Sequence, residues 1–121
     1  MSKQSVTGWK LDRSEREALL RDYPPLYAEA VADHVTLEVG GAALPPEVCA
    51  AIVGRADDGA GVEAMVVTID ETTDRPDGST FHITWSLGPG RRAIESNDVI
   101  RDCGWDKFDK PVPVALIPAS F

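Results

Sequence analysis

The residues best suited to chemistry are two histidines, each followed two positions later by a threonine. His34 opens the segment HVTL and His82 opens HITW, and the chain contains no other histidine. Residues i and i+2 of a β-strand project from one face, so each histidine shares a face with its threonine, Thr36 or Thr84. The apolar neighbours then face a core. The pattern predicts two strands that line one cleft.

Imidazole titrates near neutral pH, so it can act as a general acid or a general base. A threonine hydroxyl can donate a hydrogen bond to a phosphate oxygen. Two groups of each kind around one phosphorus atom suit in-line cleavage of a phosphodiester. One histidine would take a proton from the attacking oxygen, and the other would protonate the leaving oxygen. The sequence leaves open which is which.

This mechanism needs no metal ion, and the acidic residues of the sequence form no obvious metal-binding cluster. We therefore expect no metal and no other cofactor. A single His-x-Thr pair on a strand is most often a solvent-exposed polar pair. Its recurrence at both histidines of the chain favours a functional site.

The strands that must carry these residues are predicted from alternating apolar and β-branched positions. They span residues 5–11, 34–39, 62–70, 79–87 and 111–118. Gly40–Gly41 should end the second of them. The third and fourth are joined by the turn sequence RPDGS and should form an antiparallel hairpin. The prolines of the last one place it at a sheet edge.

Three helical segments are predicted between the strands. The first runs over Glu15–Arg21, where Ser14 and Glu17 have capping-box spacing and Pro24–Pro25 follows. The second covers 44–58, and the third, shorter one covers 96–105 with Ser96 or Asn97 as its cap. The order indicates an α+β fold with mostly antiparallel sheet and two or three helices, built as a single domain over residues 1–121.

Composition limits the partners of this domain. Its 20 acidic residues outnumber 12 basic residues and give a net charge of −8, which excludes non-specific binding to long nucleic acid through phosphate contacts. A small nucleotide or an RNA end remains a possible substrate. The apolar stretches are too short to span a membrane. The N-terminal segment has no apolar stretch of a secretory signal, and Cys49 and Cys103 suit buried or half-buried thiols, so we expect a cytoplasmic protein.

The paired segments HVTL and HITW resemble the motifs of the 2H phosphoesterase superfamily, in which each motif reads His, hydrophobic, Ser or Thr, hydrophobic. The opening TGWKLDRSEREALL also looks like members associated with RNA repair. The resemblance implies a bilobal α+β fold with a central groove. It implies cleavage of 2',3'-cyclic phosphates, 2',5'-linked oligonucleotides or other cyclic nucleotide phosphodiesters, with His34, Thr36, His82 and Thr84 as catalytic residues. The spacing of 48 residues from His34 to His82 is short for this superfamily, which leaves the substrate open.

Three further residues are candidates for substrate binding. Tyr27 could stack on a base, although packing is the commoner role of such a residue. Arg91 and Arg92, in the loop GPGRR, could reach a phosphate or simply be solvated. Asp33 is predicted to face away from His34 and to be an unlikely partner for it.

Two other functions fit the sequence less well than an enzyme. One is a binding module that holds a nucleotide or cyclic phosphate without turnover. The other is a protein-interaction or inhibitor domain in which the histidine motifs are incidental. Turnover separates the enzyme from the binding module, and convergence of the two imidazoles on one cleft separates both from the third.

Overall fold

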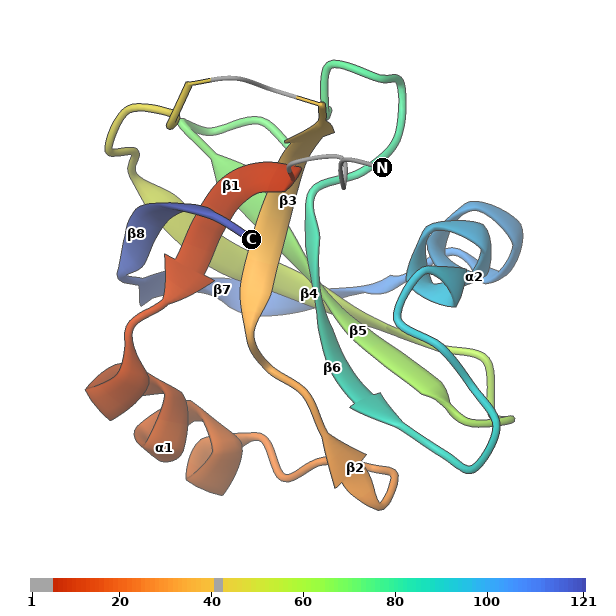
Figure 1. The fold of residues 1–121 in the computed structure, drawn as a ribbon. Coiled ribbons are helices and arrows are strands. Elements are labelled where there is room, and N and C mark those ends of the chain that lie inside the picture. The colour runs from red at the N-terminus through yellow and green to blue at the C-terminus, as the bar shows by residue number, and fades with distance from the viewer. Residues whose placement is uncertain (1–5, 41–42) are drawn as a thin grey trace.

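Two antiparallel sheets and two helices make up the part of the chain that the computed structural model describes, residues 6–40 and 43–121 (Figure 1). One sheet has the order β3-β1-β8, with β1 at Val6–Leu11, β3 at His34–Val39 and β8 at Leu116–Ser120. The other has the order β2-β6-β5-β4-β7, with bounds Glu29–Ala30, His82–Leu87, Val62–Ile69, Ala50–Asp57 and Asp106–Val114. The helices are α1, Arg13–Asp22, and α2, Glu95–Cys103. The predicted α+β class is confirmed.

The apolar residues form two clusters, one on each face of the five-stranded sheet. The larger cluster lies between the two sheets and includes Trp9, Val35, Ile83 and Trp85, all almost fully buried. The smaller one lies between the other face of the sheet and α2. Burial of each large apolar side chain contributes about 1.5–3 kcal/mol to stability. Val35, Ile83 and Trp85 thus fix which face of each motif strand points into the core.

The predicted hairpin of β5 and β6 is confirmed, since Met65 pairs with Ile83 and Val66 with His82 in antiparallel register. The predicted last strand, 111–118, is divided at Ala115 between two strands, and its predicted edge position is confirmed for both. The proline-containing tail forms two strands, β7 and β8, and each lies at the edge of a different sheet. A strand edge tolerates proline because no neighbour needs the missing N–H.

The predicted helix over 44–58 is wrong, because residues 50–57 form β4 in the middle of the larger sheet. Gly54 and Ala56 are buried and Arg55 and Asp57 are not, which is the two-residue period of a strand. A register shift between Ile52 and Gly54 places Ile52 in the larger cluster and Ala56 in the smaller one. Gly54 also disfavours a helix, and the β-branched Ile52 and Val53 favour a strand. Pairing with β5 and β7 on both sides outweighs the helical spacing of the sequence.

The helix caps also differ from the prediction. Asp12, not Ser14, is the N-cap of α1, because its Oδ1 accepts hydrogen bonds from the backbone N–H groups of Ser14 and Glu15. Ile94 is the N-terminal cap of α2 and makes no side-chain capping bond. Ser96 is instead turned to the adjacent strand β6, where it contacts Thr84.

Three remaining features complete the comparison with the sequence. Cys49 and Cys103 are both exposed, so the predicted burial is wrong; Cys49 lies before β4 begins and Cys103 in the last turn of α2. Ser5 and Gly41, which were assigned to a strand and to its end, lie outside the described residues. No helix of residues 6–40 and 43–121 is long and apolar enough to cross a membrane.

Gly8 allows β1 to pass close to β3, and this leads to a prediction. A Cβ atom built on Gly8 lies 2.1 Å from the carbonyl oxygen of Val35, a backbone atom that cannot turn away. Gly8→Ala is expected to lower the free energy of unfolding by about 3 kcal/mol, measured by chemical denaturation. Gly78→Ala is the control, since it meets open space and loses only about 1 kcal/mol from its positive φ. An equal loss in the two variants would contradict the close packing of β1 on β3.

Candidate active site

The two motif strands are brought together where the chain passes from one sheet to the other. The backbone N–H groups of Val31 and Ala32 donate to the carbonyl oxygens of Trp85 and Thr84, at 2.8 and 3.0 Å, so this segment runs along β6. Ala32 has a φ of 41°, and after it the chain turns away into β3. β3, which begins at His34, therefore lies beside β6 (Figure 1).

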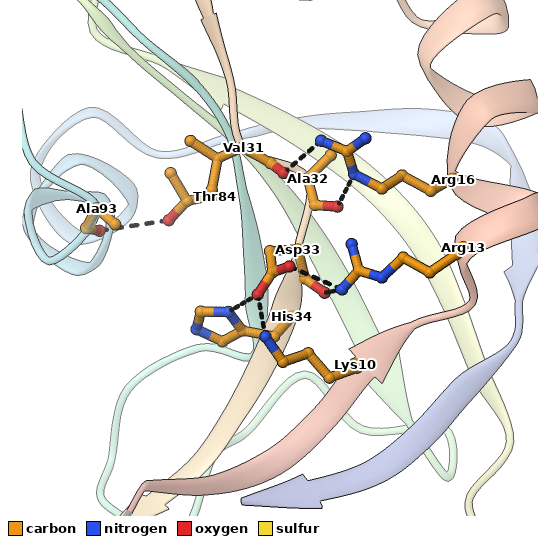
Figure 2. A network of polar contacts seen from close by, with 9 residues as sticks. All are labelled: Lys10, Arg13, Arg16, Val31, Ala32, Asp33, His34, Thr84 and Ala93. Carbon is orange, nitrogen blue, oxygen red and sulfur yellow. Dashed lines mark hydrogen bonds and ion pairs between the residues drawn. The ribbon is translucent and has the colours of Figure 1, made fainter. Parts of the chain in front are cut away.

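Two arginines of α1 hold this crossing segment in place (Figure 2). Arg16 donates from Nε to the carbonyl oxygen of Ala32 and from Nη2 to that of Val31, both at 2.9 Å. Arg13 donates from Nη2 to Oδ1 of Asp33 at 2.7 Å. Helix α1 thus fixes the three residues that precede His34, and through them the position of its ring.

A cavity of about 420 Å³ lies on the polar side of the two motif strands, and we refer to it as the groove. Its volume is in the range of small-molecule sites. The groove is lined by Val6, His34, Thr36, Val39, Arg75, His82, Thr84, Ala93, Ile94, Asn97 and Phe121. All four residues of the His-x-Thr pairs are among them. No aspartate or glutamate is among the described residues that line it.

His34 is oriented by the carboxylate beside it, contrary to the sequence prediction. Its Nδ1 lies 2.9 Å from Oδ2 of Asp33, so Nδ1–H donates to the carboxylate and Nε2 is left for a substrate. The strand alternation that predicted otherwise does not apply, because β3 begins only at His34 and Asp33 lies before it. Figure 2 shows Asp33 between His34, Lys10 and Arg13.

Asp33 stays ionised in this position. Partial burial raises its pKa, but hydrogen bonds from Lys10, His34 and Arg13 outweigh burial and hold the pKa well below its ordinary value. Lys10 Nζ lies 2.6 Å from the same oxygen that accepts from His34. The carboxylate at Nδ1 fixes the orientation and tautomer of the His34 ring and directs Nε2 to the groove.

His82 has a different environment. Its Nδ1 donates to the carbonyl oxygen of Thr80 at 2.8 Å, which leaves Nε2 of the neutral ring as a proton acceptor. Burial lowers the pKa of His82, and the positive charges of Arg75 and His34 lower it further, although the bond to Thr80 opposes these effects. His82 is therefore neutral, and able to accept a proton, down to a lower pH than an ordinary histidine.

The two threonines are not equivalent either. Thr36 is half-buried and faces the groove from β3. Thr84 is 8% exposed, and its hydroxyl lies 2.8 Å from Oγ of Ser96 and 3.3 Å from the carbonyl oxygen of Ala93, at the start of α2. Thr84 thus ties β6 to α2 as well as lining the groove, whereas Thr36 is the more accessible hydroxyl.

Arg75 is a groove residue that the sequence analysis missed. It lies in the loop between β5 and β6, is 9% exposed, and lines the groove together with both histidines. Its Nε and Nη2 donate to the two carboxylate oxygens of Asp77, at 3.1 and 2.9 Å. This fork fixes the guanidinium, and hydrogen bonds from Arg75 and Ser79 hold the pKa of Asp77 well below its ordinary value. Its sequence signal was the arginine of RPDGS, which we interpreted only as a turn.

The three predicted substrate contacts lie away from the groove. Tyr27 donates from its hydroxyl to Asp57. Arg91 forms ion pairs with Asp58 and Glu95 at 2.8 and 3.0 Å, so its charge is already neutralised. Arg92 is exposed on the loop before α2. Tyr27 and Arg91 are paired with Asp57 and Asp58 near the end of the β4–β5 hairpin, which explains why these two side chains do not extend to the histidines.

Apart from Asn97, the rest of the groove wall is apolar. The ring of Phe121 lies against that of His34, with centroids 4.3 Å apart, and Lys10 Nζ is 5.0 Å from the Phe121 centroid. Val39 and Ile94 also line the groove although they are 60% and 68% exposed. A wall of this kind can accept the flat face of a base or a ribose next to the polar centre.

Neither metal-ligand groups among the described residues nor comparison with known proteins gives a further indication of function. No group of three or more His, Cys, Asp or Glu residues that could hold a metal ion occurs within the described ranges. Comparison of the chain with protein-family models, with curated proteins and with solved structures found no match, so its function has to be inferred from its own residues.

Proposed function

We propose that this protein is a metal-independent phosphodiesterase of the 2H type, with the groove as its active site and the two sheets as its two lobes. Its substrates would be cyclic or 2',5'-linked nucleotide phosphodiesters, including 2',3'-cyclic phosphates at RNA ends. The observation that carries the proposal is that both His-x-Thr pairs line one cavity together with a buried arginine.

The charge of the groove supports an anionic substrate. The chain has a net charge of −8, yet the titratable residues that line the groove are His34, His82 and Arg75. A site of opposite sign to the rest of the surface attracts an anion and keeps it in one place. A phosphodiester carries one negative charge, and a short substrate avoids the repulsion that a long polyanion meets from the acidic surface.

The two histidines suit different steps of the reaction. His82 is neutral, so its Nε2 takes the proton of a water molecule as the water oxygen attacks phosphorus. His34, whose Nδ1 is held by Asp33, would be the acid and give a proton from Nε2 to the oxygen that leaves. One P–O bond forms and one breaks, and a cyclic phosphate becomes a phosphomonoester with a free hydroxyl. The proton on His82 then passes to solvent and His34 regains one.

The donors around the groove would stabilise the transition state. Negative charge builds up on the non-bridging oxygens as phosphorus becomes five-coordinate, and fixed donors aimed at these oxygens lower the barrier. The guanidinium of Arg75 is fixed by Asp77, and Thr36 faces the groove from the opposite strand. Both donors are in place before the substrate binds, so little reorganisation is needed during the reaction.

The direct test is hydrolysis of a substrate panel in the presence of EDTA. The panel holds nucleoside 2',3'-cyclic phosphates, 2',5'-linked oligoadenylates and cyclic dinucleotides, and products are resolved by chromatography. Turnover that survives EDTA and depends on both histidines is the expected result. Binding without turnover would indicate a nucleotide-binding module and not an enzyme. Absence of both binding and turnover would reject the proposed function.

Asp33 gives a further prediction as a positioning residue for His34. Asp33→Asn removes the charge next to Nδ1 while keeping the size of the side chain. A hydrogen bond to a charged group is worth about 1.5–3 kcal/mol, so kcat should fall by about 10–100-fold with little change in KM. Steady-state kinetics measure both constants.

The matched control is Asp109→Asn, a change of an exposed aspartate on β7. This variant should keep full activity. If Asp33→Asn instead raises KM and leaves kcat unchanged, the carboxylate does not act through His34.

A further inference from the structure

A second cavity, of about 410 Å³, adjoins the groove at Asn97 of α2. Asn97 lines both cavities. Thr80, whose carbonyl holds His82, and Asp77, which holds Arg75, also line the second one. Thr80 and Asp77, which hold His82 and Arg75 of the groove, therefore line this second space, which we call the side cavity.

Asn97 has an unsatisfied polar atom at this junction. Its Oδ1 is buried and has no hydrogen-bond donor among the described residues. Leaving such an atom unpaired costs about 1–3 kcal/mol. A hydroxyl or amino group of a ligand that extends from the groove into the side cavity would supply the missing donor once the Asn97 amide turns its Oδ1 towards it.

Trp105 gives the side cavity a flat aromatic wall. A Cβ atom on Gly54 would lie only 2.2 Å from Cε3 and 2.6 Å from Cζ3 of Trp105, so the indole packs directly on the backbone of β4. The side chain is half-buried and lines the side cavity, and it also borders a further cavity next to Arg55 and Asp57. Stacking of a base on such a ring contributes about 1–3 kcal/mol.

The charges of the side cavity differ from those of the groove. Arg101 lines it, but this side chain is paired with Asp98 at 3.2 Å and with Asp102 at 2.9 Å. Asp77 adds a carboxylate, which is itself paired with Arg75. The charges are balanced, so the cavity is suited to an uncharged group and offers little attraction for a second phosphate.

We propose that the side cavity binds the second nucleoside of the substrate, so that groove and side cavity together take a dinucleoside monophosphate. The single phosphodiester lies at the histidines, one nucleoside lies on the apolar wall near Phe121, and the other stacks on Trp105 across Asn97. This subsite rests on the proposed function of the groove. It makes a linked dinucleoside a better ligand than a mononucleoside cyclic phosphate, which fills the groove alone.

Titrations followed by NMR test the subsite without relying on activity. The probes are ApA with a 2',5' linkage, ApA with a 3',5' linkage, and adenosine 2',3'-cyclic phosphate, each added to the unmodified protein at low temperature. The indole N–H signal of Trp105 reports on the side cavity, and the ring signals of His34 and His82 report on the groove. Trp9 and Trp85 are internal controls, because both are buried and their indole N–H groups are bonded to backbone carbonyls.

At least one ApA probe is expected to shift the signals of Trp105 and of the histidines. The cyclic phosphate is expected to shift only the histidine signals. Trp105→Ala should weaken ApA binding about 10-fold and binding of the cyclic phosphate less than twofold, whereas Trp105→Phe should keep most of the affinity. If ApA shifts the histidines but not Trp105, or if Trp105→Ala weakens both ligands equally, the subsite is rejected and the proposed function stands. If no probe shifts a histidine, both are rejected.

Discussion

Replacement of His34 or His82 by alanine is expected to lower kcat for phosphodiester hydrolysis by about 10²–10⁴-fold in each case. Each variant removes one proton-transfer group and leaves the other in place. The two losses should not add up fully in the double variant, because base and acid act in the same step. Steady-state and single-turnover kinetics on the best substrate of the panel measure these effects.

Two features make this test specific. Both rings are half-buried at the groove surface and not in the core, so the variants should unfold cooperatively, which circular dichroism checks. Arg92→Ala and Tyr27→Phe serve as controls, since neither residue lines the groove, and both should stay within about twofold of the unmodified protein. Activity that survives in both histidine variants would show that the paired motifs do not carry the chemistry.

The central part of the site could be predicted from sequence because it depends on local geometry. Alternation along a strand fixes that His34 and Thr36 share a face, and the same holds for His82 and Thr84. Val35, Ile83 and Trp85 then anchor the opposite face in the core, as their burial shows. Neither inference needs knowledge of which strands pair.

The remaining groove residues depend on contacts between distant segments. Arg75 reaches the groove because the loop between β5 and β6 folds back at the Asp74–Thr80 bridge, and Phe121 reaches it because β8 pairs with β1. The prediction of a helix over 44–58 was wrong for the same reason. Its residues have neighbours on both sides in β5 and β7, and pairing with them decides the structure.

Asp33 shows the limit of a periodic pattern. The alternation rule holds only inside a strand, and the strand begins one residue later. The result is an asymmetry that the two similar motifs do not suggest. His34 has a carboxylate at Nδ1, whereas His82 has a backbone carbonyl, and this difference is the basis for naming His34 the acid and His82 the base.

The second large effect is expected for Arg75→Gln, which removes the guanidinium and keeps a polar side chain. Loss of one fixed donor to a developing oxyanion costs about 10²–10³-fold in kcat. Arg75→Lys keeps the charge but not the fork that binds Asp77, so it should recover only part of this loss. Added guanidinium ions should partly restore the activity of Arg75→Gln.

The pH dependence separates this role from a structural one. His82 has to be neutral to accept a proton, so kcat/KM falls as the pH drops through its pKa. Burial, assisted by the charge of Arg75, lowers this pKa. The acid limb of the kcat/KM–pH profile of the unmodified protein should therefore lie below the ordinary histidine pKa of about 6.5. Without the nearby cation the imidazolium costs less, and in Arg75→Gln the limb should move to higher pH.

Asp77→Asn is the matched control for both readouts. It loosens the guanidinium but keeps its charge, and it removes a carboxylate that raises the pKa of His82. The acid limb should therefore stay in place or move to lower pH, while kcat falls by about 10-fold. If the two substitutions only damaged the loop between β5 and β6, Arg75→Gln and Asp77→Asn would lose similar activity. Neither would then move the acid limb to higher pH. An upward shift of the limb in Arg75→Gln alone therefore identifies the guanidinium as a charge that acts on His82 inside the groove.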